Sequence, residues 1–292
     1  MNVMAASAPE WQRLGFVPGA TLRLFGMRRS GNHAIAAWLQ RNAGNGHALF
    51  LNNCARKRDP LKSFASIEMD GCRVSHDAAR DDLACVGAGA GNGALLLMSY
   101  EDNLPDEARE DSPMSGSFNL SLIDRNVLIY RSFLNWVASL TRKLQLNETY
   151  SVARRASALM RAVDIYRRLL EFVEGKLGPK DVAICYDRWH ADADHRSELL
   201  EQLGLPARDN RLGPVQAYGG GSSFQKAASD AGELEIDKRW TQMADDIEYQ
   251  AILALSAQDK ALTGVLGRMF PKDREVLGQI AAHSKFPQEV LR

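Results

Sequence analysis

The stretch Thr21–Leu39, TLRLFGMRRSGNHAIAAWL, contains the pattern that decides the fold class. Its apolar start is typical of a buried strand, and the pattern breaks at Gly26. After a short basic loop it resumes beyond Gly31 with apolar residues at helical spacing. A strand, a glycine-bounded loop and a helix N-terminus make an anion site, because backbone N–H groups and the positive end of the helix dipole point at one place. With Arg28 and Arg29 in the loop, the sequence predicts a site for a phosphate or sulfate ester.

The residues after the second glycine argue against an ordinary nucleotide-hydrolysing loop. A Walker A motif has Gly, four residues, Gly, then Lys and Ser or Thr. Gly26 and Gly31 have that spacing, but Asn32 and His33 follow them. The Lys that reaches the outer phosphates and the hydroxyl that holds Mg²⁺ are both missing. An ATPase or GTPase loop is therefore disfavoured.

The order Arg29-Ser30-Gly31-Asn32-His33 resembles the 5′-phosphosulfate loop of sulfotransferases that use 3′-phosphoadenosine 5′-phosphosulfate (PAPS). The family has Lys and two Thr where this chain has Arg29, Asn32 and His33. The resemblance implies that the loop, with Arg28 beside it, binds the phosphosulfate through its backbone N–H groups. It also implies that Arg29 stabilises charge on the bridging oxygen and the departing phosphate. The alternative interpretation is a turn whose basic residues are only solvated.

A second stretch, Asn126–Lys143, reads NVLIYRSFLNWVASLTRK. A short apolar run ends in Arg131, and a helical pattern follows that contains Ser139, eight positions on. In sulfotransferases an Arg and a Ser at this spacing hold the 3′-phosphate of PAPS, and an Arg fork suits a phosphate dianion. A structural Arg at a strand end and an exposed helical Ser are the alternative. The Arg stands where kinase-like proteins have a Walker B Asp for Mg²⁺.

Two weaker matches lie further along the chain. Asp181–Trp189, DVAICYDRW, predicts a strand ending in Tyr-Asp and then a helix, as sulfotransferases have with Tyr-Glu. Tyr218–Lys226, YGGGSSFQK, is similar to the glycine-bearing loop that closes the 3′-phosphate and adenine site in that family. The resemblance implies that Ser222 and Ser223 donate to phosphate and that Phe224 lies against the adenine. The alternatives are a structural strand-to-helix corner and a flexible linker.

The strand before Tyr100-Glu101-Asp102 points to a general base. Transfer of a sulfuryl group to a hydroxyl is an in-line displacement, in which the acceptor loses its proton as it attacks. Many sulfotransferases place a His or Glu at the end of a central strand for this step. Glu101 is the first choice here, and His33 and His76 are the reserves. The alternative is an acidic pair that merely starts a loop.

Composition narrows the class of protein but does not choose within it. The chain has 292 residues, of which 45% are hydrophobic and 25% charged, and its formal net charge is zero. There is therefore no electrostatic case for nucleic acid or an anionic membrane as a partner. The four cysteines show no Cys-x-x-Cys pair, so no zinc site is predicted. No signal peptide or membrane-length apolar run is evident, which predicts a cytoplasmic protein without a membrane span.

Strand and helix patterns alternate along the chain, which predicts one α/β domain over residues 1–292 with a mostly parallel central sheet flanked by helices on both faces. Irregular insertions are expected at about 56–92 and 101–124, and a helical part is expected from the glycine loop to about Phe270. The predicted strands are Thr21–Phe25, Ala48–Leu51, Ala94–Ser99, Val127–Tyr130 and Asp181–Tyr186, and the helices include Asn32–Asn42, Ser151–Lys176 and Ala193–Leu203. Ligands bind at the carboxyl ends of such strands, where the loops just described begin.

Together these patterns support the hypothesis of a PAPS-dependent sulfotransferase with a P-loop-like architecture. The acceptor is expected to be a hydroxyl, on a saccharide or a small metabolite, and no metal is required because a sulfuryl group carries less charge than a phosphoryl group. Two rival hypotheses remain open. One is a P-loop kinase with a degenerate loop, and the other is a non-catalytic nucleotide-binding protein of the same fold.

Overall fold

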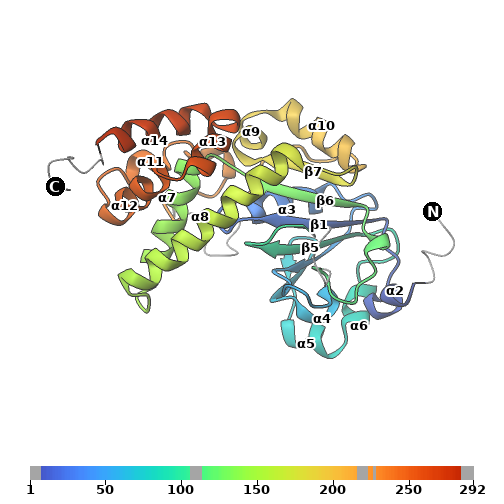
Figure 1. Cartoon of the computed structure of the whole chain (residues 1–292). Coiled ribbons are helices and arrows are strands. Elements are labelled where there is room, and N and C mark those ends of the chain that lie inside the picture. The colour runs from blue at the N-terminus through green and yellow to red at the C-terminus, as the bar shows by residue number, and fades with distance from the viewer. Residues whose placement is uncertain (1–7, 106–113, 216–222, 226–227, 284–292) are drawn as a thin grey trace. The chain divides into compact units, whose positions relative to one another are not determined.

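The computed structural model describes residues 8–105, 114–215, 223–225 and 228–283 (Figure 1). The chain divides into two compact units. Unit 1 consists of Met1–Tyr130, Leu177–Gly221 and Ser229–Gly232, and unit 2 consists of Arg131–Lys176, Ser222–Ala228 and Glu233–Arg292. The sheet belongs to unit 1, and the described part of unit 2 is mainly helical.

The sheet has seven strands in the order β4-β3-β2-β5-β1-β6-β7. Their bounds are β1 Ala20–Gly26, β2 Ala48–Asn52, β3 Ser66–Met69, β4 Cys72–Arg73, β5 Leu95–Glu101, β6 Arg125–Tyr130 and β7 Asp181–Cys185. Strands β2, β5, β1, β6 and β7 run parallel, whereas β3 and β4 form an antiparallel edge. The prediction of an α/β protein with a mostly parallel sheet is confirmed.

The order of the parallel strands shows where a ligand is expected. Strand β6 is the neighbour of β1 in the sheet. After β1 the chain continues to β2, which lies on the side of β1 away from β6. After β6 the chain continues in the opposite direction, to β7. Adjacent strands whose connections leave in opposite directions mark the switch point at which open α/β sheets bind ligands. The carboxyl ends of β1 and β6 are therefore the edge of unit 1 to inspect.

The central strands of the sheet in unit 1 are buried. The central strands β1 and β5 are buried along nearly their whole length, as parallel strands covered on both faces are. One face packs against α2 (Pro9–Leu14), α4 (Pro60–Ser63), α5 (His76–Asp81) and α6 (Leu83–Ala88), which Figure 1 draws on the same side of the strands. Helix α3 (Asn32–Arg41) contacts β2, and its Trp38 packs edge-on against Trp189 of α9 (Tyr186–Ala191). Helix α10 (Ala193–Leu203) matches its predicted bounds.

The segment 56–92 was predicted to be irregular, and that prediction is wrong. It contains α4, the β3–β4 hairpin, α5 and α6. Asp70 and Gly71 both have positive φ, 53° and 78°, and form the two-residue turn between the strands. An Asp-Gly pair is a strong hairpin signal, but the flanking strands are too short to show alternation. In the segment 101–124, the described residues form turns and a short 3₁₀ helix (Leu120–Leu122).

Unit 2 contains α7 (Phe133–Gln145), α8 (Val152–Gly175), α11 (Arg239–Gln242), α12 (Ile247–Ala257), α13 (Lys260–Met269) and α14 (Pro271–His283). The helical C-terminal part therefore extends beyond Phe270. Asp273 of α14 accepts hydrogen bonds from Ser132 Oγ (3.2 Å) and from Leu134 N–H (3.3 Å). A carboxylate thus caps the N-terminus of α7, just after Arg131 in the chain.

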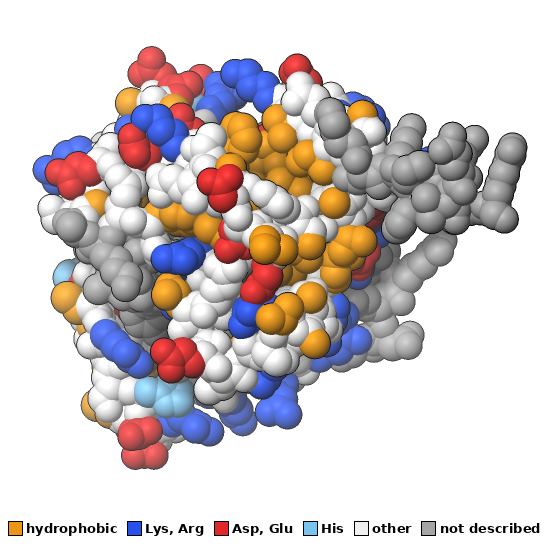
Figure 2. Space-filling model, turned by 90° about the vertical axis from the view of Figure 1, so that its left-hand side faces the viewer, with side chains coloured by type: hydrophobic (Ala, Val, Ile, Leu, Met, Phe, Trp, Pro, Cys, Tyr) orange, Lys and Arg blue, Asp and Glu red, His pale blue; other side chains and the backbone are white. Residues whose placement is uncertain are grey.

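Exposed apolar side chains occur on the helices of unit 2. They include Ile247 and Leu255 on α12 and Val152 and Met160 on α8. Hydrophobic side chains gather in patches on the face shown in Figure 2, which is the side where Figure 1 draws α12 and α14. Of the helices in the described ranges, none combines the length and the apolar character needed to cross a membrane.

Candidate functional site

The loop after β1 is a tight turn with a constrained backbone. Arg29 and Gly31 both adopt positive φ, 70° and 99°, and Ser30 N–H donates to the Met27 carbonyl at 3.1 Å. Asn32 Nδ2 donates back to the Met27 carbonyl (3.2 Å). These contacts fix residues 27–32, which we call the anion loop.

Helix α3 begins at Asn32, as predicted, and no side chain caps its N-terminus. Its first-turn N–H groups therefore lie at the positive end of the helix dipole without a capping oxygen. Ser30 is fully buried, and its Oγ has no hydrogen-bond partner among the described residues. A buried hydroxyl without a partner requires an explanation. An anion bound at the helix N-terminus would supply the missing acceptor.

Tyr186, the first residue of α9, packs directly on the anion loop. A Cβ added to Gly31 would lie 2.2 Å from the Tyr186 ring, so this position requires glycine for space as well as for backbone conformation. Tyr186 itself stacks on Trp189, with ring centroids 5.6 Å apart. The predicted strand-to-helix corner is confirmed as β7 followed by α9, but the strand ends at Cys185, so Tyr186 and Asp187 belong to the helix and not to the strand end. The tyrosine packs on Gly31 of the loop.

The end of β5 lies beside the anion loop because of the strand register. Gly26 is paired with Glu101 across the β1–β5 ladder, and Asp102 N–H donates to the Gly26 carbonyl (3.1 Å). Asp102 accepts from the backbone N–H of Arg28 (2.8 Å) and forms an ion pair with its guanidinium. Arg28 is thus bound to the end of β5, whereas Arg29 contributes positive charge near His33 and Glu101.

Glu101 and His33 form a titratable pair beside the anion loop, with Glu101 Oε1 3.9 Å from His33 Nε2. Burial, and then the charge of Asp102, raises the pKa of Glu101, although Arg28, a hydrogen bond from Asn32 and Arg29 oppose the shift. Burial, and then Arg29, lowers the pKa of His33 to about 4. His33 is therefore neutral at pH 7, and Glu101 is a stronger base than an exposed glutamate.

Two other titratable residues of unit 1, His76 and Cys54, have different surroundings. His76 starts α5, where its Nε2 lies 3.2 Å from the Phe64 carbonyl oxygen and its ring packs edge-on against Phe64. Burial raises the pKa of the Cys54 thiol, so Cys54 is a protonated core residue. Within the described ranges no group of three or more His, Cys, Asp or Glu side chains is arranged to hold a metal ion.

Arg131 and Ser139, the predicted 3′-phosphate residues, both lie fully buried in unit 2. Arg131 Nη2 donates to the Ile236 carbonyl (2.9 Å), and the Arg131 carbonyl accepts from Tyr166 Oη (2.6 Å). Ser139 Oγ accepts from Arg239 Nη1 at 2.8 Å. The chain segment from Ile236 to Arg239 therefore contacts both predicted residues. The alternative of an exposed helical Ser139 is wrong.

Arg239, the first residue of α11, is a buried cation that the sequence analysis missed. Only 6% of it is exposed, and its guanidinium carbon lies 5.8 Å from the centre of the Phe224 ring. No motif surrounds it, so only the folded contacts identify it. Ser223 is also buried, whereas Ser222 lies outside the described residues. We call Arg131, Ser139 and Arg239 the arginine cluster.

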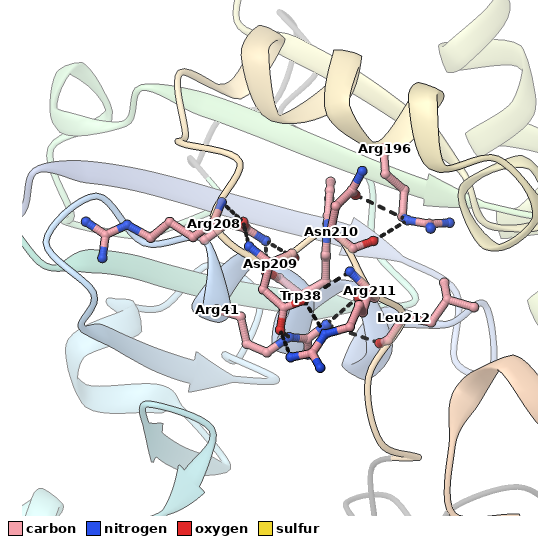
Figure 3. Close-up of polar contacts among 9 residues, drawn as sticks. Trp38, Arg41, Arg196, Arg208, Asp209, Asn210, Arg211 and Leu212 are labelled. Carbon is pink, nitrogen blue, oxygen red and sulfur yellow. Dashed lines mark hydrogen bonds and ion pairs between the residues drawn. The ribbon is translucent and has the colours of Figure 1, made fainter.

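The base of the glycine-rich segment is held within unit 1. Val215 N–H donates to the Ser229 carbonyl (2.8 Å), and Ala231 N–H donates to the Gly213 carbonyl (2.9 Å). Residues 209–212, which precede this segment in the chain, form hydrogen bonds with Arg41 at the C-terminal end of α3 (Figure 3). Arg41 Nε donates to Asp209 Oδ2 (3.2 Å), and its Nη2 donates to the Arg211 carbonyl (2.7 Å). The helix that starts at the anion loop therefore also fixes one end of this segment.

The sequence was compared with protein-family models and with curated protein sequences. No protein-family model matches the sequence, and no curated protein sequence is significantly similar to it. The functional interpretation therefore depends on the residues and contacts described above.

Replacing Gly31 by Ala is expected to destabilise the protein by roughly 2–4 kcal/mol, because the new methyl group meets the Tyr186 ring and the left-handed backbone disfavours an L side chain. Gly44→Ala is the matched control, since no heavy atom lies within 4 Å of its added Cβ. Urea denaturation measures both free energies of unfolding. Equal stability of the two variants would contradict the packing described here.

The burial of His33 predicts a specific pH dependence of stability. Below pH 6.5 the unfolded chain protonates this imidazole, whereas the folded chain does so only near pH 4. Unfolding therefore takes up a proton in this window, and this contribution lowers the stability of the folded state as pH falls. His33→Asn should remove this loss, so wild type should lose on the order of 3 kcal/mol relative to the variant between pH 7 and pH 4. Denaturant titrations measure the difference, and an NMR midpoint for His33 near pH 6.5 would contradict it.

Proposed function

We propose that this protein is a PAPS-dependent sulfotransferase that transfers the sulfuryl group to a hydroxyl acceptor. In unit 1, the anion loop has the backbone donors proposed for the 5′-phosphosulfate. In unit 2, taken by itself, the arginine cluster has the groups that the resemblance assigns to the 3′-phosphate. The observation that carries the proposal is the arginine cluster, in which Arg131 and Arg239 are buried and Ser139 Oγ accepts from Arg239. The Arg239 guanidinium donates to the Ser139 hydroxyl, and the buried Arg131 guanidinium donates to the Ile236 carbonyl, three residues before Arg239. Guanidinium and hydroxyl groups are donors that suit a phosphate dianion.

The side chains of unit 1 support the chemistry of the transfer. The acceptor oxygen forms a bond to sulfur while the bond between sulfur and the bridging oxygen breaks, which releases adenosine 3′,5′-diphosphate. Glu101 takes the acceptor proton, since its raised pKa makes it an effective base. Arg29 and the N-terminus of α3 stabilise the charge that develops on the leaving phosphate. Neutral His33 lies beside Glu101 as the reserve base.

The two rival functions make different predictions about ligands. A degenerate P-loop kinase would bind ATP with Mg²⁺ and would lose activity with EDTA, but the loop has no Lys and β6 is followed by Arg131 rather than by Asp. A non-catalytic relative would bind adenosine 3′,5′-diphosphate without any transfer from PAPS. A thermal-shift comparison of adenosine 3′,5′-diphosphate with ATP and Mg²⁺ distinguishes the kinase from the sulfotransferase. The ligand that binds the folded state raises the midpoint of thermal unfolding.

Replacing an arginine of the cluster should remove recognition of the 3′-phosphate. A charge-assisted contact contributes roughly 1.5–3 kcal/mol, so Arg131→Ala and Arg239→Ala should each weaken adenosine 3′,5′-diphosphate binding at least about tenfold. Binding of adenosine 5′-phosphate should change little. Arg142→Ala, on the same helix as Ser139 but exposed, is the matched control. Calorimetry measures the affinities, and equal losses for both nucleotides would exclude this role.

Replacing Glu101 by Gln keeps the shape of the side chain and removes the carboxylate. The turnover rate should fall by roughly 10²–10⁴-fold, while the affinity for adenosine 3′,5′-diphosphate stays near that of wild type. Glu201→Gln, at an exposed position on α10, is the control and should retain full activity. Transfer from radiolabelled PAPS measures the rate. Near-normal turnover of Glu101→Gln would assign the base to His33 or His76.

A further inference from the structure

Two adjacent carboxylates at the end of β5 have different surroundings. Glu101 is the last residue of the strand and is paired with Gly26 of β1. Asp102 leaves the strand with a positive φ of 54°, and its N–H donates to the Gly26 carbonyl (3.1 Å). Residues other than glycine rarely adopt this backbone, and those that do concentrate at functional sites. The proposed function takes Glu101 as the base and leaves Asp102 without a role.

The Asp102 carboxylate binds one residue of the anion loop through both of its oxygens. Oδ1 accepts from the backbone N–H of Arg28 (2.8 Å), and Oδ2 pairs with the Arg28 guanidinium. Together with the N–H bond from Asp102 to Gly26, these contacts join the end of β5 to the start of the anion loop. They hold the guanidinium against the residue that follows the proposed base.

Both members of this ion pair act on Glu101. Burial is the largest cause of the raised pKa of Glu101, the charge of Asp102 adds to it, and the charge of Arg28 opposes it. Because the two charges act in opposite directions, their pairing limits the effect of Arg28 on the neighbouring carboxylate. A guanidinium that bound Glu101 directly would lower the pKa of this carboxyl by roughly 1–3 units.

The other groups that act on Glu101 come from the anion loop and from α3. Arg29 opposes the rise in pKa through its charge, and Asn32 opposes it through a hydrogen bond. His33 Nε2 lies 3.9 Å from Glu101 Oε1, and the lowered pKa of His33 keeps this imidazole neutral at pH 7. Of the described groups that act on Glu101, Asp102 is therefore the one with a negative charge.

We propose that Asp102 is a positioning residue that holds the Arg28 guanidinium away from Glu101, so that the Glu101 carboxylate stays available for the acceptor proton. The inference rests on the proposed function, because it takes Glu101 as the base. A carboxylate that is paired with a guanidinium is a weaker base, and its oxygens are occupied by the donors of the fork. Asp102 thus acts through Arg28 and not on the acceptor.

The titration of Glu101 in Asp102→Asn tests this role. Asn removes the charge, keeps an oxygen that can accept from the Arg28 N–H, and tolerates the left-handed backbone. NMR of ¹³C-labelled glutamate carboxyl groups measures the midpoint, and the Glu101 signal is assigned by its loss in Glu101→Gln. The midpoint should fall by roughly one pH unit or more. Asp164→Asn, which removes the exposed partner of Arg167 on α8, is the matched control and should leave the midpoint unchanged.

A double variant separates positioning from simple repulsion between adjacent carboxylates. In wild type, Arg28→Gln should change the Glu101 midpoint little, because Asp102 holds the guanidinium. In the Asp102→Asn background the same substitution should restore most of the lost midpoint, because it removes the guanidinium that has moved to Glu101. Repulsion alone predicts that Arg28→Gln has equal effects in the two backgrounds.

An unchanged midpoint in Asp102→Asn, or equal effects of Arg28→Gln in the two backgrounds, would overturn the proposal. Circular dichroism checks that each variant is folded, and Asp102→Gly, which also accepts the left-handed backbone, takes the place of an Asn variant that does not fold. The titrations require no nucleotide. They therefore test Asp102 even if wild type does not bind adenosine 3′,5′-diphosphate, the result that would refute the proposed sulfotransferase function.

Discussion

The contact of the Tyr186 ring with Gly31 is the constraint on which the anion loop depends. Gly31 has a left-handed backbone and no side chain, so the ring packs directly against the residue before α3. This packing orients the first turn of α3, whose N–H groups and dipole create the positive potential of the loop. The loop is thus built from backbone geometry, and its charged side chains modify a site that the backbone has already formed.

The strand register also determines how charge is distributed around this loop. Asp102 pairs with Arg28 and so limits the positive charge on one side of the loop. Glu101 remains partly desolvated, with a raised pKa, next to an imidazole that burial keeps neutral. A base of raised pKa beside a helix N-terminus is what the proposed transfer would require for removal of the acceptor proton. Both effects follow from the strand register that places Glu101 opposite Gly26.

Strongly periodic elements could be predicted from the sequence, whereas elements defined by tertiary contacts could not. Helix α10 has its predicted bounds, and α3 starts at the predicted residue, because apolar spacing and a glycine marked them. The β3–β4 hairpin was missed although Asp70-Gly71 signalled its turn, since strands of this length show no alternation. Arg239 was missed because its neighbour Ser139 lies one hundred residues away in the chain.

The sequence by itself determined the alternation of strands and helices, the glycine-bounded loop and the candidate residues Glu101, Arg131 and Ser139. These features are local, so the spacing and the type of nearby residues are sufficient to predict them. Only the tertiary structure decided that Tyr186 supports Gly31, that Arg239 joins Ser139, and how burial shifts the pKa values of Glu101 and His33. Such properties depend on which distant segments exclude water from a side chain, and that information arises only when the chain has folded.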